Sequence, residues 1–308
     1  MKILVLGTSG QVGYELVFAL APIGDVIGAM RTPGKNAHVD LNDHTSLNGA
    51  LDASNADIIV NAAAYTAVDR AEDDAAAAQR INGDALADIG AWAKKNNRLV
   101  VHYSTDYVFD GEGNRPYRED DKTSPLGVYG RTKLAGEVAL RDSGCDHFIF
   151  RTAWVYAARG KNFLLTMLKV GVERDEVRVV NDQRGTPTSA RLIATTTAAV
   201  LQRWLALDDT RKRQVLGTYH LCATGECTWY EFARAIFADA QSAGLIERSP
   251  RVTPITTADY PTRAKRPRYS VLDMTKIRDA FGVDLPDWKK GLRDVISELT
   301  KNIAKAPC

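Results

Sequence analysis

The sequence predicts an α/β fold, because short apolar runs alternate with helical patterns through its N-terminal half. This alternation is typical of crossover units and of a parallel sheet covered on both faces. A glycine-spaced turn directly after the first apolar run is a second observation, and a length of 308 residues, more than one compact core usually needs, is a third. Together they predict a Rossmann-like doubly wound parallel sheet with a smaller, mixed α/β C-terminal lobe.

Five apolar runs in the N-terminal half are predicted to be strands, at 3–6, 26–29, 57–60, 99–103 and 147–151. Helical patterns follow or separate them, over 10–21, 41–53, 67–96 and 129–141. Glycines and prolines interrupt every period between 110 and 126, which predicts a loop there. We therefore expect a dinucleotide-binding domain over 1–160, with returns to it around 186–222.

The alternation loosens beyond about Lys161, which predicts a less regular lobe over 161–308 that mainly binds the substrate. Helices are expected at 162–172, 190–205, 229–243, 274–281 and 288–302. Short strands are expected near Val177 and Tyr219.

Composition and charge are ordinary for a globular protein, with 45% hydrophobic residues, 25% charged residues and a net charge of +2. Such a small net charge argues against a nucleic-acid partner. The first apolar run is too short for a signal peptide or a membrane span, so we expect no membrane association and a cytoplasmic location.

The cysteines and histidines give no sign of a metal site. Cys145, Cys222, Cys227 and Cys308 show no paired CxxC arrangement, and we interpret them as free thiols in a reducing cytoplasm. Zinc at Cys222 and Cys227 would need a second ligand pair, and the five histidines show no ligand spacing. We expect no catalytic metal.

A GxxGxxG turn joins the first predicted strand to the first helix. Gly7 permits a tight turn, Gly10 lets backbone N–H groups approach a pyrophosphate, and Gly13 allows close packing of the helix. The helix dipole favours the anion. A glycine-rich turn without a nucleotide is the alternative, but the position after the first strand and the motif described below favour a dinucleotide.

The end of the second predicted strand carries Arg31 rather than an acid. A carboxylate about 20 residues after the glycines usually binds the ribose 2′-hydroxyl of NAD, whereas an arginine accommodates a 2′-phosphate. The sequence thus favours NADPH, with NADH as a second usable cofactor. The alternative is that Arg31 is a solvated loop cation.

Tyr129 and Lys133 lie four residues apart in a helical pattern and so share one face of a helix. An ammonium near a phenol stabilises the phenolate and lowers the phenol pKa towards neutrality. Thr105 follows a predicted strand, where its hydroxyl could bond the substrate oxygen that Tyr129 protonates, and Asn82 could anchor a water path that refills the proton. A hydride from the cofactor and a proton from Tyr129, both transferred to a carbonyl group, would reduce it to an alcohol, so these residues predict carbonyl reduction. Surface packing is the alternative for a YxxxK match.

Three further segments have two interpretations each. The small side chains of Asn61–Tyr65 would let backbone lie flat against a nicotinamide or ribose, or they begin an alanine-rich helix. Asp40 with Leu41 is either a helix N-cap or a contact with adenine. The acidic cluster is interpreted as a solvated helix face rather than a site; it comprises Asp69, Glu72, Asp73 and Asp74.

Seven long strings of residues resemble one enzyme family. They are Gly7–Gly13, DIIVNAAAYTAVD at 57–69, VHYSTDYVF at 101–109, SPLGVYGRTKLAGE at 124–137, FRTAWVY at 150–156, NDQRGTPT at 181–188 and YPTRAKRPRYSVL at 260–272. Over nearly its whole length the chain resembles the dTDP-4-dehydrorhamnose reductase family of the extended short-chain dehydrogenases/reductases.

The resemblance implies NAD(P)H-dependent reduction of the C4 keto group of dTDP-6-deoxy-L-lyxo-4-hexulose (dTDP-4-dehydro-L-rhamnose) to dTDP-L-rhamnose. This is nucleotide-sugar biosynthesis for cell-surface polysaccharide such as the O-antigen of lipopolysaccharide. In this family Tyr129 would donate the proton, Lys133 would hold the nicotinamide ribose and lower the tyrosine pKa, and Thr105 would orient the substrate oxygen. A homodimer is a candidate assembly.

The resemblance also implies positions that line the two ligands. Those that would face the dTDP-4-keto-6-deoxy sugar are Val68, Asp106, Trp154 and, for its diphosphate, Arg266. Those that would line the cofactor are Gly10, Gln11, Val12, Asp40, Leu41, Ala63, Ala64, Tyr65 and Tyr103.

Two other functions stay open at this level. An epimerase or epimerase/reductase of the same fold keeps its NAD bound and returns the hydride, so stoichiometric NADPH consumption separates it from a reductase. A non-catalytic regulatory subunit is a second alternative; loss of Tyr129 or Lys133 would indicate it, and both are present.

Overall fold

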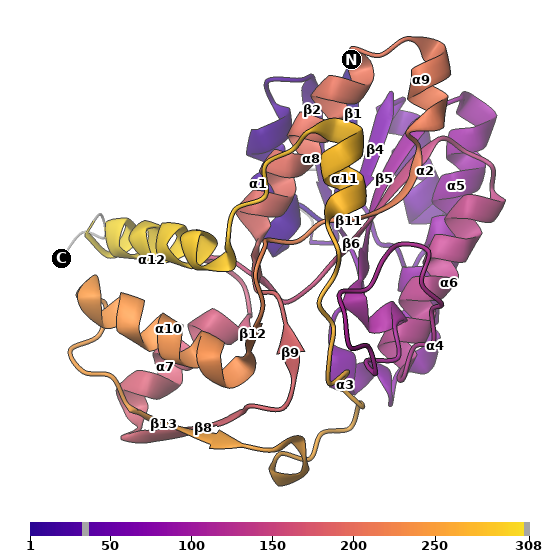
Figure 1. The fold of residues 1–308 in the computed structure, drawn as a ribbon. Coiled ribbons are helices and arrows are strands. Elements are labelled where there is room, and N and C mark those ends of the chain that lie inside the picture. Colours follow the sequence, from indigo (N-terminus) through magenta and orange to yellow (C-terminus); the bar gives the residue numbers. More distant parts are fainter. Residues whose placement is uncertain (33–36, 305–308) are drawn as a thin grey trace.

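A computed structural model describes residues 1–32 and 37–304, which form two lobes (Figure 1). The larger lobe is built on a seven-stranded sheet, and the smaller lobe lies beside it. The carboxyl ends of the sheet strands point towards the smaller lobe, so the two lobes face each other where ligands of open α/β sheets gather.

The central sheet is parallel throughout. Its strands are β1 (Lys2–Leu6), β2 (Asp25–Met30), β3 (Ala37–His38), β4 (Ile58–Asn61), β5 (Leu99–Thr105), β6 (His147–Thr152) and β11 (Gly217–His220). Their spatial order is β11-β6-β5-β4-β1-β2-β3, and every neighbouring pair is parallel. The chain winds outward in both directions from β1 and β4, which makes the gap between them the topological switch point. The predicted Rossmann-like doubly wound sheet is confirmed.

Helices cover both faces of the sheet because successive strand residues point to opposite sides. Ile3 and Val5 of β1 pack into one apolar cluster, whereas Leu4 and Leu6 pack into another. The first cluster includes residues of α1 (Gln11–Leu20), α8 (Ala190–Leu205) and α11 (Thr275–Phe281). The second includes residues of α2 (His44–Ser54), α5 (Ala85–Asn96) and α6 (Val128–Asp142). Burial on both faces explains why the strands read as continuous apolar runs.

The smaller lobe is held together by its own apolar cluster. Its helices are α7 (Phe163–Glu173), α10 (Trp229–Ser242) and α12 (Trp288–Ala304). Its strands are β8 (Glu176–Val180), β13 (Arg251–Ile255), β9 (Arg184–Gly185) and β12 (Cys227–Thr228), while β7 (Val155–Tyr156) and β10 (Thr188–Ser189) pair nearby. The five C-terminal helices expected from the sequence are present, and the sequence did not predict α9 (Asp209–Gln214) or β13.

Residues 186–222 contribute to both parts of the molecule. Strand β11 pairs with β6 at the edge of the central sheet, and α8 packs on the same face of that sheet as α1. Strand β10, by contrast, pairs with β7 outside the sheet. A dinucleotide-binding domain over 1–160 and a substrate-binding lobe over 161–308 remain our proposed division.

The prediction of one helix over 67–96 is wrong. The segment contains α3 (Val68–Ala71), α4 (Ala75–Gln79), a π-helical turn (Arg80–Asp84) and α5. The backbone leaves the helical region at Asp74, with φ −128° and ψ 47°. The π turn carries Asn82, whose side chain is buried, and such turns often mark functional sites.

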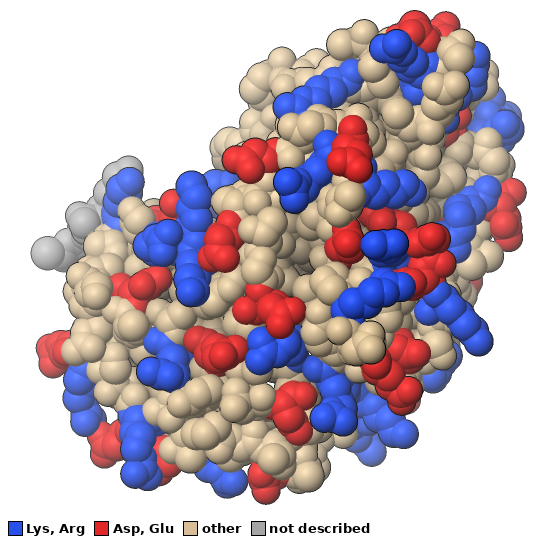
Figure 2. All heavy atoms as spheres, in the orientation of Figure 1, with Lys and Arg blue, Asp and Glu red and all other residues tan. Residues whose placement is uncertain are grey.

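Surface and cysteine chemistry add few constraints. Lys and Arg are interspersed with Asp and Glu over the face shown in Figure 2, in keeping with the small net charge. Within residues 1–32 and 37–304 there is no helix long and apolar enough to cross a bilayer, and no group of side chains suited to holding a metal. Cys145, Cys222 and Cys227 are buried free thiols, and Cys308 lies outside the described residues.

Candidate active site

The glycine turn lies at the carboxyl end of β1, at the switch point of the sheet. Gly7 has φ +88°, a conformation that favours glycine, and a Cβ there would lie 2.8 Å from the backbone nitrogen of Ala63. A Cβ at Gly13 would collide with the Gly7 carbonyl group. Gly10 is the N-cap of α1 and donates its N–H to the Gly7 carbonyl oxygen, 2.9 Å away. The turn therefore leaves the helix N-terminus bare of side chains, which suits a diphosphate.

The loop after β4 lies against this turn. Residues 62–67 are not helical, so the interpretation of Asn61–Tyr65 as a helix start is wrong. Asn61 Oδ1 accepts a hydrogen bond from the Ala63 N–H (3.1 Å), and the backbone of Ala63 passes close to Gly7. Small side chains at 62–64 are what this close passage of two backbone segments requires.

Asn82 fastens the same loop to the helix that carries Tyr129. Its Oδ1 accepts from the Tyr65 N–H (2.8 Å), and its Nδ2 donates to the Tyr65 carbonyl oxygen and to Thr132 Oγ1, each 3.1 Å away. Both ends of this buried amide are thus bonded to protein groups. These contacts give the side chain a structural role in holding the loop, and its part in a water path stays a prediction.

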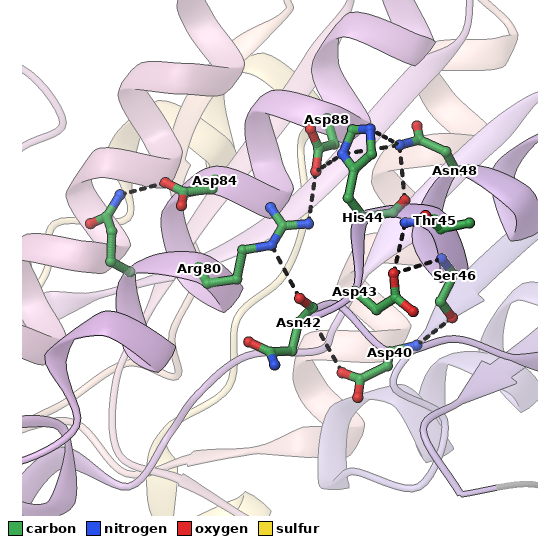
Figure 3. A network of polar contacts seen from close by, with 11 residues as sticks. Asp40, Asn42, Asp43, His44, Thr45, Ser46, Asn48, Arg80, Asp84 and Asp88 are labelled. Carbon is green, nitrogen blue, oxygen red and sulfur yellow. Dashed lines mark hydrogen bonds and ion pairs between the residues drawn. The ribbon is translucent and has the colours of Figure 1, made fainter.

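Asp40 is not the N-cap of α2 (Figure 3). That role belongs to Asp43, which accepts from the N–H groups of Thr45 (2.8 Å) and Ser46 (3.3 Å). Asp40 accepts instead from the Asn42 N–H (2.9 Å), and its own N–H donates to Ser46 Oγ (3.0 Å). The N-cap interpretation is therefore wrong, and contact with adenine remains a proposal for Asp40.

Tyr129, Thr105 and Asp106 come together at the carboxyl end of β5. Thr105 Oγ1 donates to Asp106 Oδ1 at 2.9 Å, and the Thr105 hydroxyl lies close enough to the Tyr129 phenol to influence its pKa. Burial raises the pKa of Tyr129 to about 12, which outweighs the lowering by the Thr105 hydroxyl. Burial also raises the pKa of Asp106 to about 6, against the lowering by the Ser270 and Thr105 hydroxyl groups. The phenol is protonated at neutral pH, as a proton donor must be.

Lys133 is buried one turn further along α6. Its Nζ donates to the Tyr103 carbonyl oxygen (2.6 Å) and lies 3.2 Å from His102 Nε2. Burial lowers the pKa of Lys133 to about 8, although the nearby Glu137 carboxylate raises it. The sequence argument expected Lys133 to lower the pKa of Tyr129, but the pKa of Tyr129 is raised, because desolvation of the phenol is the larger effect.

Helix α6 is anchored at both ends by groups from other elements. Glu72 Oε1 accepts from the Val128 N–H (2.8 Å), at the helix N-terminus. Further along, the buried Glu137 carboxylate receives two hydrogen bonds from Arg151 on β6, at 2.9 and 2.7 Å. Burial pushes the pKa of Glu137 up, but the Arg151 contacts outweigh it and the pKa is lowered. These anchors fix the height of Tyr129 and Lys133 above the sheet.

Trp154 follows β6 and faces the smaller lobe. It has φ +46°, a strained value for a non-glycine residue, and its ring stacks on Trp229 of α10 with centroids 3.4 Å apart. A Cβ at Gly185 would collide with this indole ring. Trp154 is thus held in one orientation from two sides, and sequence reasoning did not single out Trp229.

The acidic cluster is partly exposed, and its members are also bonded to other groups of the protein. Asp69 receives both Arg266 guanidinium nitrogens, at 3.3 and 2.7 Å, and the Ala264 N–H at 3.1 Å. The other members are also bonded: Asp73 to Arg263 (2.6 Å), Asp74 to the Tyr65 hydroxyl (3.2 Å), and Glu72 to the start of α6. The expected solvated face is therefore only part of the picture, because these exposed carboxylates also pair with groups from elsewhere in the chain.

The remaining predicted residues lie around the glycine turn. Gln11 Oε1 accepts from Asn162 Nδ2 (2.8 Å), which ties the turn to the start of α7. Leu41 is buried in the cluster under α2, and Arg31 is exposed at the end of β2. The Tyr103 ring points to α8, where its hydroxyl bonds Thr197 Oγ1 (2.8 Å), so its carbonyl is the group near Lys133. Val12 is half-buried beside Gly13, and Ala64 is half-buried in the loop after β4.

Sequence reasoning also missed His102 and Asn162. His102 alternates with Tyr103 along β5, and a histidine in a fully buried strand was the available signal. Asn162 directly precedes an apolar helical run, which is a recognisable N-cap position.

Fold and site define a class of protein. A parallel sheet with a glycine turn after its first strand, and a tyrosine and a lysine four residues apart beside a strand-end threonine, is the arrangement of a short-chain dehydrogenase/reductase.

Comparison with known proteins narrows the class. The model of the RmlD substrate binding domain family matches residues 1–301. The dTDP-4-dehydrorhamnose reductases of Escherichia coli K12 and Burkholderia thailandensis are each 44% identical to the chain, covering 97% of it and 98% and 100% of their own lengths. A solved dTDP-4-dehydrorhamnose reductase from Bacillus anthracis, in complex with NADP, is 30% identical with a TM-score of 0.86, covering 96% of this chain and 99% of that one. The chain belongs to the dTDP-4-dehydrorhamnose reductase family and is an oxidoreductase.

Proposed function

We propose that this protein reduces the C4 keto group of dTDP-4-dehydro-L-rhamnose to give dTDP-L-rhamnose, with NADPH as the preferred cofactor and NADH as an alternative. The closeness of the Tyr129 and Thr105 hydroxyl groups at the end of β5 is the observation that carries this proposal. The named activity of the relatives supports the choice of substrate.

The glycine turn fits a nicotinamide dinucleotide, because side chains at Gly7 or Gly13 would fill the cradle. Gly10, Gln11 and Val12 would hold the diphosphate, and Ala63–Tyr65 would lie along the nicotinamide ribose. When bound, this cofactor supplies a hydride to the ketone carbon. Arg31 is exposed at the end of β2, where it would meet a 2′-phosphate.

Tyr129 would donate its proton to the ketone oxygen as that oxygen becomes an alkoxide. Burial keeps the phenol protonated, and Thr105 would bring a second hydroxyl group to the same point. Donors placed where negative charge develops stabilise the transition state more than the ketone. Lys133 would hold the nicotinamide ribose.

The dTDP sugar would lie between the lobes. Trp154 would face the sugar, with Val68 and Asp106 on the larger lobe. Arg266 would bind the diphosphate by exchanging part of its pairing with Asp69. We also propose a cytoplasmic homodimer whose product is a glycosyl donor for cell-surface polysaccharide.

The test is to mix the purified protein with NADPH and the dTDP-4-keto sugar and to follow the absorbance of the reduced nicotinamide. One NADPH consumed per dTDP-L-rhamnose formed supports the proposal. Sugar conversion without net NADPH consumption would show an epimerase instead, and no conversion would show a non-catalytic protein.

A further inference from the structure

A chain of hydrogen-bonding groups runs from the cofactor loop to Lys133. Asn61 on β4 and His102 on β5 are direct partners in the sheet register. Asn61 Nδ2 lies 3.3 Å from His102 Nδ1, and His102 Nε2 lies 3.2 Å from Lys133 Nζ. All three side chains are buried, so each must find its partners within this chain.

The orientation of the Asn61 amide is determined by the backbone. The Ala63 N–H can only donate, and it donates to Asn61 Oδ1 (3.1 Å). The amide nitrogen of Asn61, which also can only donate, must therefore be the atom that faces His102 Nδ1. It follows that Nδ1 is an acceptor, and that a neutral His102 carries its proton on Nε2.

The Nε2 proton points at Lys133. An ammonium has three donors and no acceptor, so an N–H of a charged Lys133 would face the Nε2–H of His102 and neither group could accept. An uncharged amine has a lone pair that accepts from Nε2, while one of its own hydrogens still donates to the Tyr103 carbonyl oxygen (2.6 Å). With the ring protonated at Nε2, the contact between Nε2 and Lys133 Nζ is satisfied only by the amine form of Lys133.

We propose that His102 is a positioning residue for Lys133: through the tautomer that Asn61 imposes, it favours the amine over the ammonium and brings the charge change of Lys133 close to neutral pH. This role of His102 does not depend on the proposed reduction.

The charges around Lys133 agree with this assignment. His102 faces it from β5; burial first and Lys133 second lower the His102 pKa well below its ordinary value and outweigh the Asn61 backbone, which raises it, so the imidazole is neutral. Asn61 faces the chain from β4 and is uncharged. Glu137, on the same helix as Lys133, favours the ammonium, but Arg151 (2.7 Å) and Arg141 (3.1 Å) already pair with its carboxylate. Burial lowers the pKa of Lys133 to about 8 in spite of Glu137.

The tautomer of His102 can be determined in the wild-type protein. Long-range proton–nitrogen NMR correlations of histidine-labelled protein distinguish the two ring nitrogens, and His102→Gln identifies the signals. We expect a neutral ring protonated at Nε2. A ring protonated at Nδ1, or a cationic ring, would overturn the proposal.

The charge of Lys133 is tested by titration of lysine-labelled protein, with Lys133→Met to identify the side-chain signal. We expect a midpoint near 8 in the wild type, and a midpoint raised by roughly one unit in His102→Gln, because the new amide oxygen can accept from an ammonium. His220→Gln is the matched control: His220 is equally buried but bonds to the Asp273 carbonyl oxygen, so the midpoint of Lys133 should not move.

Equal midpoints in the wild type and His102→Gln, or a wild-type midpoint at the ordinary lysine value, would overturn the proposal. If His102→Gln does not fold, Asn61→Asp serves as the second variant: its carboxylate would draw the imidazole proton to Nδ1 and raise the midpoint of Lys133, and an unchanged tautomer would count against the proposal. Neither measurement uses turnover, so failure here is distinguishable from failure of the proposed reduction.

Discussion

The two lobes contribute to the site in different ways. On the larger lobe, Thr105 and Lys133 are buried and Tyr129 is half-buried, on a strand end and a helix, and Thr105 and Lys133 are bonded to neighbouring protein groups. On the smaller lobe, Trp229 presents an aromatic face, against which Trp154 is held with a strained backbone. We propose that the regular lobe carries the proton transfer and that the irregular lobe contacts the substrate.

The comparison implies that larger-lobe substitutions reduce the rate, whereas smaller-lobe substitutions weaken substrate binding. The largest effect is expected for Tyr129→Phe, which removes the proton donor and should lower kcat by roughly 10³ while NADPH still binds. Steady-state kinetics and a cofactor titration measure both. Tyr219→Phe is the control, because it removes a buried hydroxyl whose partner is the Val215 carbonyl oxygen, away from the site. Near-normal turnover in Tyr129→Phe would break the assignment.

Thr105→Val should lower kcat by roughly 100-fold, because it removes a hydroxyl placed at the developing negative charge. Thr105→Ser keeps that hydroxyl and should recover most of the rate. If serine and valine were equally slow, the methyl group rather than the hydroxyl would be the important feature, and the role given to Thr105 would be wrong.

A further prediction for the larger lobe concerns how Asp106 makes the stability of the protein depend on pH. Its pKa is raised from 3.8 to about 6 by burial, so between these values the folded state binds more protons than the unfolded state. Its contribution to the free energy of unfolding therefore falls as pH rises from about 4 to 6. Asp106→Asn removes this pH dependence. Between about pH 4 and 6 the free energy of unfolding of the variant should therefore rise by about 2 kcal/mol relative to that of the wild type, as measured by urea unfolding. A stability difference between the two proteins that does not change with pH would contradict it.

Arg31→Ala tests the outer end of the cofactor site. Loss of a charge-assisted contact with the 2′-phosphate should weaken NADPH binding by roughly tenfold and leave NADH binding unchanged. Equal losses for both cofactors would mean that Arg31 does not read the 2′-phosphate.

The smallest effect is expected where the two lobes meet, at the stacked tryptophans. Trp154→Ala removes one member of a stacked pair and should raise KM for the sugar nucleotide by about three- to tenfold, with kcat nearly unchanged. Trp229→Ala should show a weaker change of the same kind. A loss of kcat as large as that of Tyr129→Phe would remove the distinction between the lobes.

The same contrast explains what could be predicted from the sequence. The sheet, the glycine turn and the placement of Tyr129 with Lys133 follow from local patterns, since apolar runs and helical spacing involve residues close in the chain. The roles of Asp69 and Asn82 depend on partners that local patterns do not contain. Asp69 pairs with Arg266, 197 residues away, and Asn82 bonds Thr132, 50 residues away.

The pKa shifts of the site residues could not be predicted from the sequence either. Spacing alone suggested that Lys133 would lower the pKa of Tyr129, whereas desolvation raises that pKa and lowers the pKa of Lys133. Both shifts favour the uncharged form of each side chain, because both are buried. Burial of a polar pair depends on how the whole sheet and its helices pack, which a four-residue motif does not encode.

The most direct measurement is a crystal structure of the protein with NADP⁺ and dTDP-L-rhamnose. We predict that the C4 oxygen of the sugar lies within about 3 Å of both the Tyr129 hydroxyl and Thr105 Oγ1, with C4 facing the nicotinamide ring. A complex in which the sugar's C4 oxygen contacts neither hydroxyl, although both ligands are fully bound, would contradict the account.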